Sequence, residues 1–390
     1  MYRVTASQIN IGARTFTSRW ATFDFILLLS TLAACAFGVA MVYSATHGLG
    51  PEPLSWSNLA VQHAFKALIG FVLMLMLTQV EYHMLASFVW PLYAGMVGLL
   101  ALTTALGHTA GGATRWFKLG DLPVQPSEIA KLVLVLTLAK YLSDNEKRTD
   151  RITVYIGSLI IAGIPMALIF SQPDLGTASV CGVIWLVMVV TARLRWIFLA
   201  GSVVLGVPAA WGAWTYLITT MPDKFQYMQD RLLIFLHPES DLYGQGYNIL
   251  QARISIGAGG LFGKGFLAGT QSQLHFLKVQ YADFIFSVIA EEFGLIGCLA
   301  LIALLYVIVI RYLHIAMNAP DSYGTLIAVG LATWLGMHIF VNVGMNLSLM
   351  PVVGIPLPFI SYGGSSMLSL LAAQGLLQSI ALRSRKVIFG

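Results

Sequence analysis

The residue of this 390-residue sequence that is best placed for acid–base chemistry is Asp283. It follows a segment rich in glycine, basic and aromatic residues, and it precedes a long apolar run. A carboxylate at such a boundary can accept or donate a proton. The alternative is structural, because acidic residues are favoured in the first turn of a helix. Asp283 is therefore a candidate for acid–base chemistry, with a helix-terminal acid as the alternative.

Basic residues next to an aromatic residue form a second chemical motif, in G-G-A-T-R-W-F-K-L-G. Arg115 and Lys118 could hold a phosphate, and Trp116 could stack on a sugar or a lipid. Arg and Trp also favour the headgroup layer of a membrane, where they would serve only as an anchor. The sequence leaves both alternatives open.

Three further basic residues, Arg231, Arg253 and Lys264, lie in one later segment of the chain. Lys264 stands in G-G-L-F-G-K-G, which is not a Walker A loop, because Gly265 follows the lysine where that motif requires Ser or Thr. A glycine run with one lysine nevertheless suits a close approach of the backbone to an oligo-anion.

The composition indicates that these motifs belong to a protein embedded in a membrane. Hydrophobic residues make up 57% of the chain and charged residues 10%, whereas a soluble domain carries roughly 25% charged residues. The apolar runs are continuous over about 20 residues, which predicts spanning helices and excludes barrel strands of about 10 alternating residues. About ten spans are predicted, at residues 24–46, 58–79, 83–106, 127–142, 152–171, 175–192, 196–219, 283–312, 322–347 and 364–382. The predicted fold class is an all-α polytopic membrane protein with a single membrane domain, 21–390, in which residues 220–282 form a long loop between spans seven and eight.

The distribution of basic residues predicts the orientation of the chain. Lysine and arginine mark the cytoplasmic side of short loops, and here they collect in residues 1–20, 147–151 and 383–386. Both termini, including a tail at residues 1–20, are therefore predicted to be cytoplasmic. The glycine-rich and proline-rich segments fall on the opposite side, so a site built from them would face outward. The net charge of +5 follows from this topology and does not indicate a nucleic-acid partner.

Span four opens with Q-P-S-E-I-A-K, in which Gln125 precedes the helix. Ser127 is predicted to cap the helix, and Glu128 is predicted to lie in its first turn, where the helix dipole favours a negative charge. Glu128 and Lys131 are three residues apart and can pair. The pair either serves stability alone or places Lys131 in a cavity that holds an anion, because charges inside a membrane are expensive and usually functional.

Three other acidic residues are less clearly placed. Asp174, in Q-P-D-L-G-T, is a second candidate base or a residue that fixes its loop. Glu291 and Glu292 lie about 12–14 Å deeper than Asp283 along a helix axis, too far to share a small site with it. Both glutamates are expected to find partners inside the bundle, such as Lys66, His63 or His338.

Residues 354–366, G-I-P-L-P-F-I-S-Y-G-G-S-S, cannot form a continuous helix, because they contain two prolines. Irregular backbone at membrane depth is tolerated only where protein or a cavity surrounds it. This segment is therefore predicted to be a re-entrant or gating loop before span ten.

Taken in order, these segments resemble the SEDS family of polytopic cell-wall proteins, the RodA/FtsW/SpoVE group, and they are most similar to RodA. The likeness extends from span one onward. One departure concerns Lys278-Val279 and Tyr281-Ala282, which stand where the family usually has Pro-Glu and His-Thr. The matching segments are G-A-T-R-W-F-K-L-G, Q-P-S-E-I-A-K, Q-P-D-L-G-T, Y-N-I-L-Q-A-R-I-S-I-G-A-G-G-L-F-G-K-G, D-F-I-F-S-V-I-A-E-E-F-G-L-I-G, N-V-G-M-N and G-I-P-L-P-F-I-S-Y-G-G-S-S.

The resemblance implies a peptidoglycan glycosyltransferase that polymerises lipid II into glycan strands at the outer face of the inner membrane, for cell elongation and rod shape. Its implied partner is a class B penicillin-binding protein, which crosslinks the product. The reaction expels a lipid diphosphate with inversion, and such a good leaving group needs one general base and cations more than a general acid. Asp283 is the implied base. The implied substrate-binding residues are Arg115, Trp116, Lys118, Gln125, Ser127, Glu128, Lys131, Asp174, Arg231, Arg253 and Lys264. No cofactor is certain: the sequence shows no cluster of His and Cys ligands, but a divalent cation, Mg or Mn, could supplement the basic residues.

Two other functions stay open at this point. A lipid II flippase would explain intramembrane Glu128, Lys131, Glu291 and Glu292 together with the broken backbone near Pro356. A non-catalytic scaffold for a penicillin-binding protein would explain the unusual neighbours of the acid. The enzyme is favoured, because the unusual residues are concentrated on the outer face and a transporter needs both faces.

Overall fold

The computed structural model describes residues 22–47, 55–106, 108–110, 113–119, 122–220, 222–241, 244–274, 276–277 and 279–384. The predicted tail at residues 1–20 lies outside this part of the chain.

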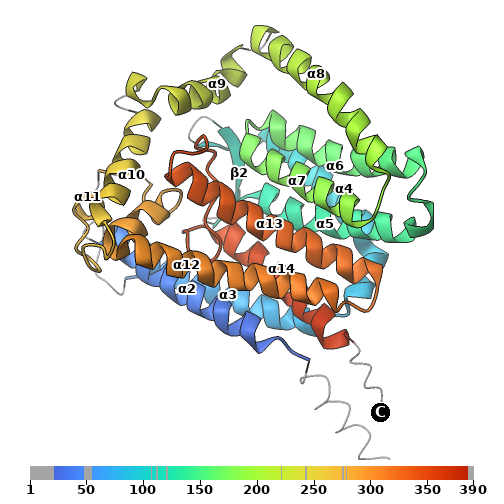
Figure 1. Cartoon of the computed structure of the whole chain (residues 1–390), viewed down its shortest axis with the longest axis horizontal. Coiled ribbons are helices and arrows are strands. Elements are labelled where there is room, and N and C mark those ends of the chain that lie inside the picture. Colours follow the sequence, from blue (N-terminus) through green and yellow to red (C-terminus); the bar gives the residue numbers. More distant parts are fainter. Residues whose placement is uncertain are drawn as a thin grey trace, which may run out of the picture.

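A bundle of long helices forms the body of the molecule (Figure 1). Each of the ten predicted spans overlaps one long helix of the structure over almost its whole length. Seven of the described helices, namely α2, α3, α4, α6, α12, α13 and α14, are long and apolar enough to cross a membrane, so the chain is a polytopic helical membrane protein, while the full set of ten spans stays a prediction. The ten helices are α2 (Phe25–Thr46), α3 (Leu59–Gln79), α4 (Tyr82–Leu106), α5 (Pro126–Asp144), α6 (Ile152–Ser171), α7 (Leu175–Thr191), α8 (Trp196–Thr220), α12 (Ile285–Met317), α13 (Ser322–Asn346) and α14 (Gly364–Arg383).

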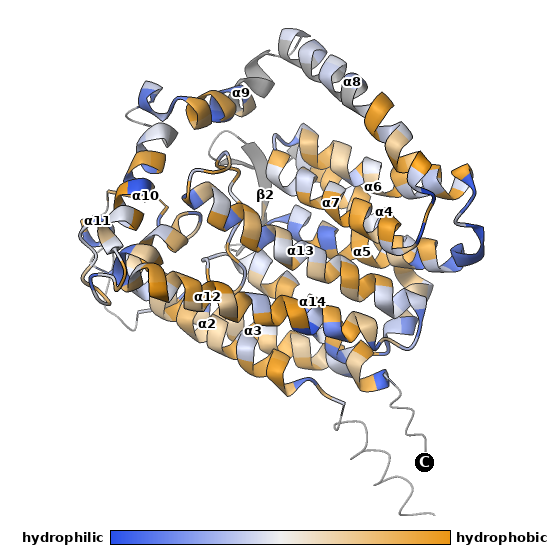
Figure 2. Cartoon of the chain, viewed as in Figure 1, coloured by the Kyte–Doolittle hydropathy of each residue, from blue (hydrophilic) through white to orange (hydrophobic). Residues whose placement is uncertain are grey.

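Helices α13 and α14 form the centre of this bundle. In an apolar 18-residue stretch of each helix, the buried share is 67% for α13 and 83% for α14. The corresponding share is 28% for α3 and 17% for α4. Helix α14 packs against α3 and α5, while α13 packs against α12, α7 and α5. Hydrophobic residues make up most of the bundle helices, and hydrophilic residues gather at the loops and helix ends (Figure 2). Many large hydrophobic side chains of these helices are exposed. Such a distribution suits a bundle surrounded by lipid.

The segments between these helices are more ordered than the sequence predicted. Between α4 and α5, three short strands, β1 (His108–Ala110), β2 (Ala113–Leu119) and β3 (Leu122–Val124), pair in an antiparallel sheet of order β1-β2-β3. Residues 220–282, predicted as a long loop, contain helices α9 (Pro222–Leu236), α10 (Gln245–Gly259) and α11 (Thr270–Gln273). Short 3₁₀ turns occupy Glu146–Arg148 and Pro238–Ser240. Helices α8 and α9 arch beyond the bundle, and α10 returns the chain to α12 (Figure 1).

Helix α12 is broken at Gly294, and the glycine-rich segment before α11 forms hydrogen bonds with the backbone groups on either side of the break. Gly294 has φ 64° and ψ −165°, outside the helical region. The amide of Leu295 donates to the carbonyl of Gly260 (2.9 Å), and the amide of Lys264 donates to the carbonyl of Glu291 (3.0 Å). A Cβ at Gly263 would overlap the Glu292 carbonyl group. Gly259 and Gly263 of this segment are therefore accounted for by close backbone packing on α12, since a Cβ at either position would overlap the carbonyl group of Ala290 or Glu292.

Replacing Gly294 with alanine should destabilise the protein. Gly294→Ala would place its Cβ 2.6 Å from the Leu261 carbonyl oxygen, at a positive φ that alanine rarely adopts. We expect a loss of about 1–3 kcal/mol in the free energy of unfolding, measured by denaturant titration in detergent. Gly98→Ala in α4 is the matched control, because nothing lies within 4 Å of its Cβ position. Equal stability of the two variants would contradict this account of the break.

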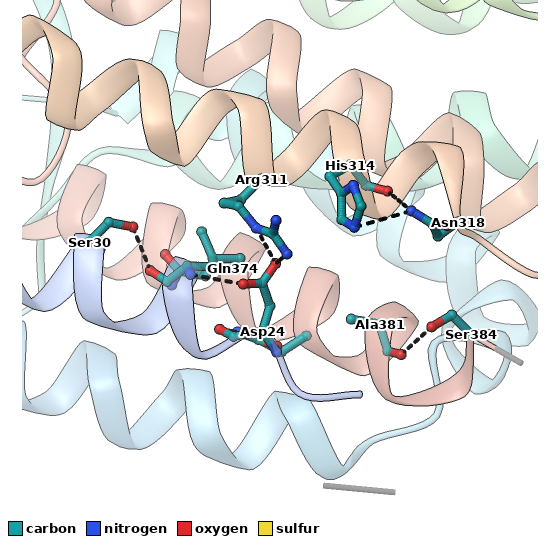
Figure 3. A network of polar contacts seen from close by, with 10 residues as sticks. Asp24, Ser30, Arg311, His314, Asn318, Gln374, Ala381 and Ser384 are labelled. Carbon is teal, nitrogen blue, oxygen red and sulfur yellow. Dashed lines mark hydrogen bonds and ion pairs between the residues drawn. The ribbon is translucent and has the colours of Figure 1, made fainter. Parts of the chain in front are cut away.

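A polar network around Asp24 joins α2, α14 and the last turns of α12 (Figure 3). The Asp24 carboxylate caps α2 by accepting from the Leu27 amide (3.0 Å). Arg311 of α12 donates to it through Nε (2.8 Å) and through a terminal nitrogen (2.7 Å). From α14, Gln378 donates to the Asp24 carbonyl (2.8 Å) and accepts from its amide (3.0 Å). One aspartate thus joins three helices.

Candidate active site around Asp283

Asp283 lies in the turn that leads into α12, and its neighbours hold the turn by the backbone. Its carbonyl oxygen accepts hydrogen bonds from the side-chain amides of Asn346 (3.0 Å) and Asn342 (3.3 Å). Its carboxylate lies beside Gly354, where an added Cβ would be 3.6 Å from Oδ2. Asp283 is half-buried, so its side chain sits at the border between the bundle and its surroundings.

The two asparagines belong to a row of polar residues along one face of α13. Trp334, His338, Asn342 and Asn346 are each four residues apart, about 6 Å along the axis. Asn342 also donates to the carbonyl of Ile355 (2.8 Å). The side-chain oxygen of Asn346 accepts from the hydroxyl of Ser287, in the first turn of α12 (2.7 Å). This face of α13 therefore fixes the turn, the start of α12 and the proline-containing loop together.

Residues 350–363 are the irregular, buried segment that the prolines predicted. Its backbone has no helix or strand, and Ile355 and Leu357 are buried. The hydroxyl of Ser361 donates to the carbonyl of Ala282 (2.7 Å), and the amide of Tyr362 donates to the carbonyl of Tyr281 (2.9 Å). The loop thus holds the Asp283 turn on one side while α13 holds it on the other. Its role as a re-entrant or gating loop stays a prediction.

A second polar cluster lies inside the bundle, where α5 meets α13. The predicted ion pair is confirmed, because Lys131 Nζ lies 2.6 Å from Glu128 Oε1 and both residues are buried. Lys131 also lies 2.8 Å from His338 Nε2, which accepts from Trp334 Nε1 (2.9 Å) as well. Because Nε2 faces two N–H donors, the His338 ring is neutral with its proton on Nδ1. His338 therefore links the Lys131 cluster to the row of residues that holds Asp283.

The start of α5 differs from the prediction that Ser127 caps this helix. Ser127 does not cap the helix, because the capping position is Gln125. Within the described part of the chain, the Ser127 hydroxyl has no hydrogen-bond partner and the Gln125 side chain makes no capping bond. Pro126 begins the helix two residues after the last residue of β3, because its fixed φ suits the first helical position. The backbone amide of Gln125 instead donates to the Ser365 hydroxyl of α14 (2.9 Å).

The predicted partners of Glu291 and Glu292 were wrong. Glu291 accepts from Lys264 Nζ (2.8 Å) and from the backbone amides of Gln271 (2.9 Å) and Ser272 (3.0 Å). Glu292 accepts a hydrogen bond from the Ser44 hydroxyl of α2. The sequence suggested Lys66, His63 or His338 because it could not show that the glycine-rich segment folds back onto α12.

The structure brings only part of the predicted site together. Asp174 caps α7 by accepting from the Thr177 amide (3.1 Å) and hydroxyl (3.0 Å), which fits its predicted loop-fixing alternative. Arg231 of α9 lines a small hollow with Pro173 and with Pro351 of the proline-containing loop. Arg231, the Asp283 turn, the start of α5 and the residues on either side of Asp174 therefore all adjoin residues 350–365.

The other basic residues lie elsewhere or are not described. Lys264 pairs with Glu291, eight residues beyond Asp283, and Arg253 is exposed on α10. Arg115, Trp116 and Lys118 lie in β2, whose backbone is placed, but their side chains are outside the described residues. Anion binding by these residues stays a prediction.

Sequence reasoning missed the row on α13. The signal was present as Trp334, His338, Asn342 and Asn346, which recur every four residues in an otherwise apolar helix. The structure also shows the positions of Val279 and Tyr281, two of the residues that depart from the family pattern. Val279 has φ 56° and is exposed, and the Tyr281 ring packs edge-on against Tyr362. Lys278 lies outside the described residues.

Comparison with known proteins places this chain in a family. The family model of FtsW, RodA and SpoVE, described as a cell cycle protein, matches residues 25–386. Peptidoglycan glycosyltransferase MrdB of Escherichia coli K12 is 36% identical over 95% of this chain and 96% of the relative. Peptidoglycan glycosyltransferase RodA of Treponema pallidum is 35% identical over 93% of this chain and 98% of the relative.

Solved structures agree with the sequence matches. A chain of a peptidoglycan synthase complex, described as coordinating polymerization and crosslinking, matches with a TM-score of 0.77 and 30% identity over 93% of this chain and 99% of that one. The rod shape determining protein RodA of Thermus thermophilus matches with a TM-score of 0.68 and 29% identity over 94% and 99%. The chain therefore belongs to the SEDS family of FtsW, RodA and SpoVE, and it is similar to RodA within that family.

Proposed function

We propose that this protein is a peptidoglycan glycosyltransferase that polymerises lipid II at the outer face of the inner membrane. The relatives named above carry this activity in their names. The observation in the structure that supports it is Asp283, whose turn is held by Asn342 and Asn346 on one side and by Ser361 and Tyr362 on the other. A general base needs such fixed placement relative to the group that it deprotonates.

In the proposed reaction, Asp283 accepts the proton of the acceptor sugar hydroxyl. The hydroxyl oxygen forms a bond to the anomeric carbon of the donor, and the bond from that carbon to the diphosphate oxygen breaks. The lipid diphosphate leaves with the electron pair, so cations near it stabilise the developing charge. Arg231 is the described candidate that adjoins the same loop as Asp283.

The topology and the partner are part of the same proposal. The predicted orientation puts both termini in the cytoplasm and Asp283 on the outer side. We also propose a class B penicillin-binding protein as partner, since a similar chain belongs to a complex that coordinates polymerization and crosslinking. Cell elongation and rod shape follow from the similarity to RodA.

A polymerisation assay tests the proposed function. The full chain, purified with its penicillin-binding protein and supplied with fluorescent lipid II, should produce glycan ladders on a gel. Lipid movement across liposomes without ladders would favour the flippase, and ladders that require only the partner would favour the scaffold. The same assay with EDTA tests the predicted Mg or Mn contribution. Among the described residues, no group of three His, Cys, Asp or Glu side chains could hold a metal ion.

Asn346→Ala should slow polymerisation without weakening substrate binding. The variant removes the shorter of the two hydrogen bonds to the Asp283 carbonyl and the acceptor for Ser287. Because misplacement by about 1 Å can cost about 100-fold in rate, we expect kcat to fall by about 10- to 100-fold. The measurement is steady-state kinetics with lipid II, and the expected change in KM is small. Asn318→Ala, at the exposed far end of α12, is the matched control. A rise in KM at unchanged kcat would show that Asn346 does not position the base.

A further inference from the structure

Lys66 is a half-buried lysine inside a candidate span, and it lacks the carboxylate partner that Lys131, Lys264 and Arg311 have. It lies in α3, seven residues after Leu59. Lys131, Lys264 and Arg311 each have a carboxylate oxygen within 2.8 Å. No carboxylate of the described residues lies within 4.0 Å of Lys66 Nζ. An unpaired cation at this depth is expensive and marks a functional site by default.

The ammonium of Lys66 is held in place by neutral groups. It donates to the Tyr362 hydroxyl (2.8 Å) and lies 4.2 Å from the centroid of that ring. The Tyr362 hydroxyl donates in turn to Gln62 Oε1 (2.7 Å). Burial raises the pKa of the Tyr362 phenol, so it stays protonated and keeps donating. These contacts orient the charge of Lys66 but do not neutralise it.

A buried histidine lies beside Lys66. His63 is 0% exposed, and neither of its ring nitrogens makes a hydrogen bond to the described part of the chain. Its ring centroid lies 5.9 Å from that of Tyr362. Because residues three and four apart share a helix face, Gln62, His63 and Lys66 face the same side of α3. The cluster therefore has unused hydrogen-bonding capacity next to a positive charge.

The neighbouring helix leaves room for the lysine. A Cβ at Gly364, the first residue of α14, would lie 3.2 Å from Lys66 Cδ and 3.3 Å from Cε. A larger side chain at residue 364 would press on the lysine stem. The position of Lys66 is thus fixed by the packing of α3 against α14.

The cluster is joined directly to the Asp283 turn. The Tyr362 amide donates to the Tyr281 carbonyl (2.9 Å), and the two rings pack edge to face with centroids 5.7 Å apart. Tyr281 precedes Asp283 by two residues. A ligand bound by Lys66 would therefore lie next to the turn that carries the proposed base.

The surface beside Lys66 is apolar and exposed. Phe65, Leu68 and Ile69 are 44%, 61% and 43% exposed on α3. In a membrane this surface faces lipid, so a ligand can reach Lys66 from within the bilayer. The chemistry that fits both features is a phosphate or diphosphate headgroup on a long apolar chain.

We propose that Lys66, with Gln62 and His63, binds the diphosphate of the lipid-linked donor while the lipid chain lies along the exposed apolar surface of α3. This inference rests on the proposed function and adds a substrate-binding residue that the sequence analysis did not select. Lys66 holds the leaving group as its charge develops, while Asp283 acts on the acceptor.

Two measurements on Lys66→Met test the proposal. In the polymerisation assay, the KM for lipid II should rise by about 10- to 100-fold, the factor expected for one charge-assisted hydrogen bond. In native mass spectrometry of the purified chain, binding of undecaprenyl diphosphate should weaken by a similar factor. The second measurement needs no catalysis, so it separates failure of this inference from failure of the proposed function. Lys66→Arg keeps the charge and should retain most of the affinity.

Controls cover the other outcomes. Lys140→Met removes an exposed lysine that pairs with Asp144 on α5, and it should change neither measurement. If Lys66→Met does not fold, Lys66→Gln replaces it, since glutamine can still donate to Tyr362. Unchanged affinity for undecaprenyl diphosphate in a folded variant would overturn the proposal. Loss of phosphatidylglycerol binding alone would overturn it too, because it would identify a phospholipid headgroup as the ligand.

Discussion

Asp283→Asn should abolish the formation of glycan ladders, with kcat lowered by about 10²- to 10⁴-fold, the usual contribution of a general base. Asparagine has nearly the shape of aspartate, so the backbone bonds from Asn342 and Asn346 to the carbonyl of residue 283 should survive. The variant loses the group that accepts the proton, and binding of lipid II should change little. The measurement is the initial rate of polymerisation by the purified complex with its penicillin-binding protein.

Two aspartates serve as comparisons for this result. Asp144→Asn is the matched control, because Asp144 is exposed at the end of α5 and pairs only with Lys140 among the described contacts. Asp174→Asn tests the second candidate base. Asp174 already accepts two hydrogen bonds from Thr177, so its loss should destabilise the start of α7 more than it slows the chemistry. Normal rates for Asp283→Asn together with a silent Asp174→Asn would exclude both aspartates as the base, whereas normal rates for Asp283→Asn and a slow Asp174→Asn would move the base to Asp174.

Helix positions could be predicted from the sequence because each span is a local property. A continuous apolar run of about 20 residues has few alternatives to a spanning helix. The break in α12 could not be predicted in this way. Gly294 interrupts an apolar run that hydropathy alone would leave as one continuous helix, and the partners of the freed backbone groups are Gly260 and Leu261, more than thirty residues earlier.

The site was predictable only where its residues are close in sequence. Glu128 and Lys131 pair as their spacing indicated, because residues three apart meet on a helix. Glu291 found Lys264 rather than Lys66, since that choice depends on how the glycine-rich segment folds back. Ser127 failed as a cap because the helix begins at Pro126, two residues earlier than a helix capped by Ser127 would begin.

The regular spacing of polar residues in α13 could be seen in the sequence, but the groups to which they bind could not. Asn342 and Asn346 were visible in N-V-G-M-N, but a sequence does not say which neighbour a side-chain amide will bind. In the structure, both donate to one backbone carbonyl, that of Asp283. Asn342 follows His338 by four residues, so the same helix face also connects the proposed base to the buried cluster on α5.

Lys131→Met should be among the most destabilising single substitutions in the bundle, because it leaves Glu128 buried without its cation. Removing one partner of a buried ion pair costs about 3–5 kcal/mol, and here the side chains are only 1% and 3% exposed. His338 would lose a donor as well. Denaturant or thermal unfolding in detergent, without substrate, measures the change.

Two further variants separate the ion pair from a general effect of removing lysine. Lys140→Met breaks a pair of the same 2.6 Å length on the same helix, but one whose side chains are 30% and 51% exposed, so its cost should stay within about 1 kcal/mol. The double variant Glu128→Gln/Lys131→Met removes both buried charges and should recover much of the lost stability. If Lys131→Met were no more harmful than Lys140→Met, the buried pair would contribute nothing specific to the fold. If the double variant recovered stability but not polymerisation, the Glu128–Lys131 pair would be required for the reaction itself, as the resemblance first implied.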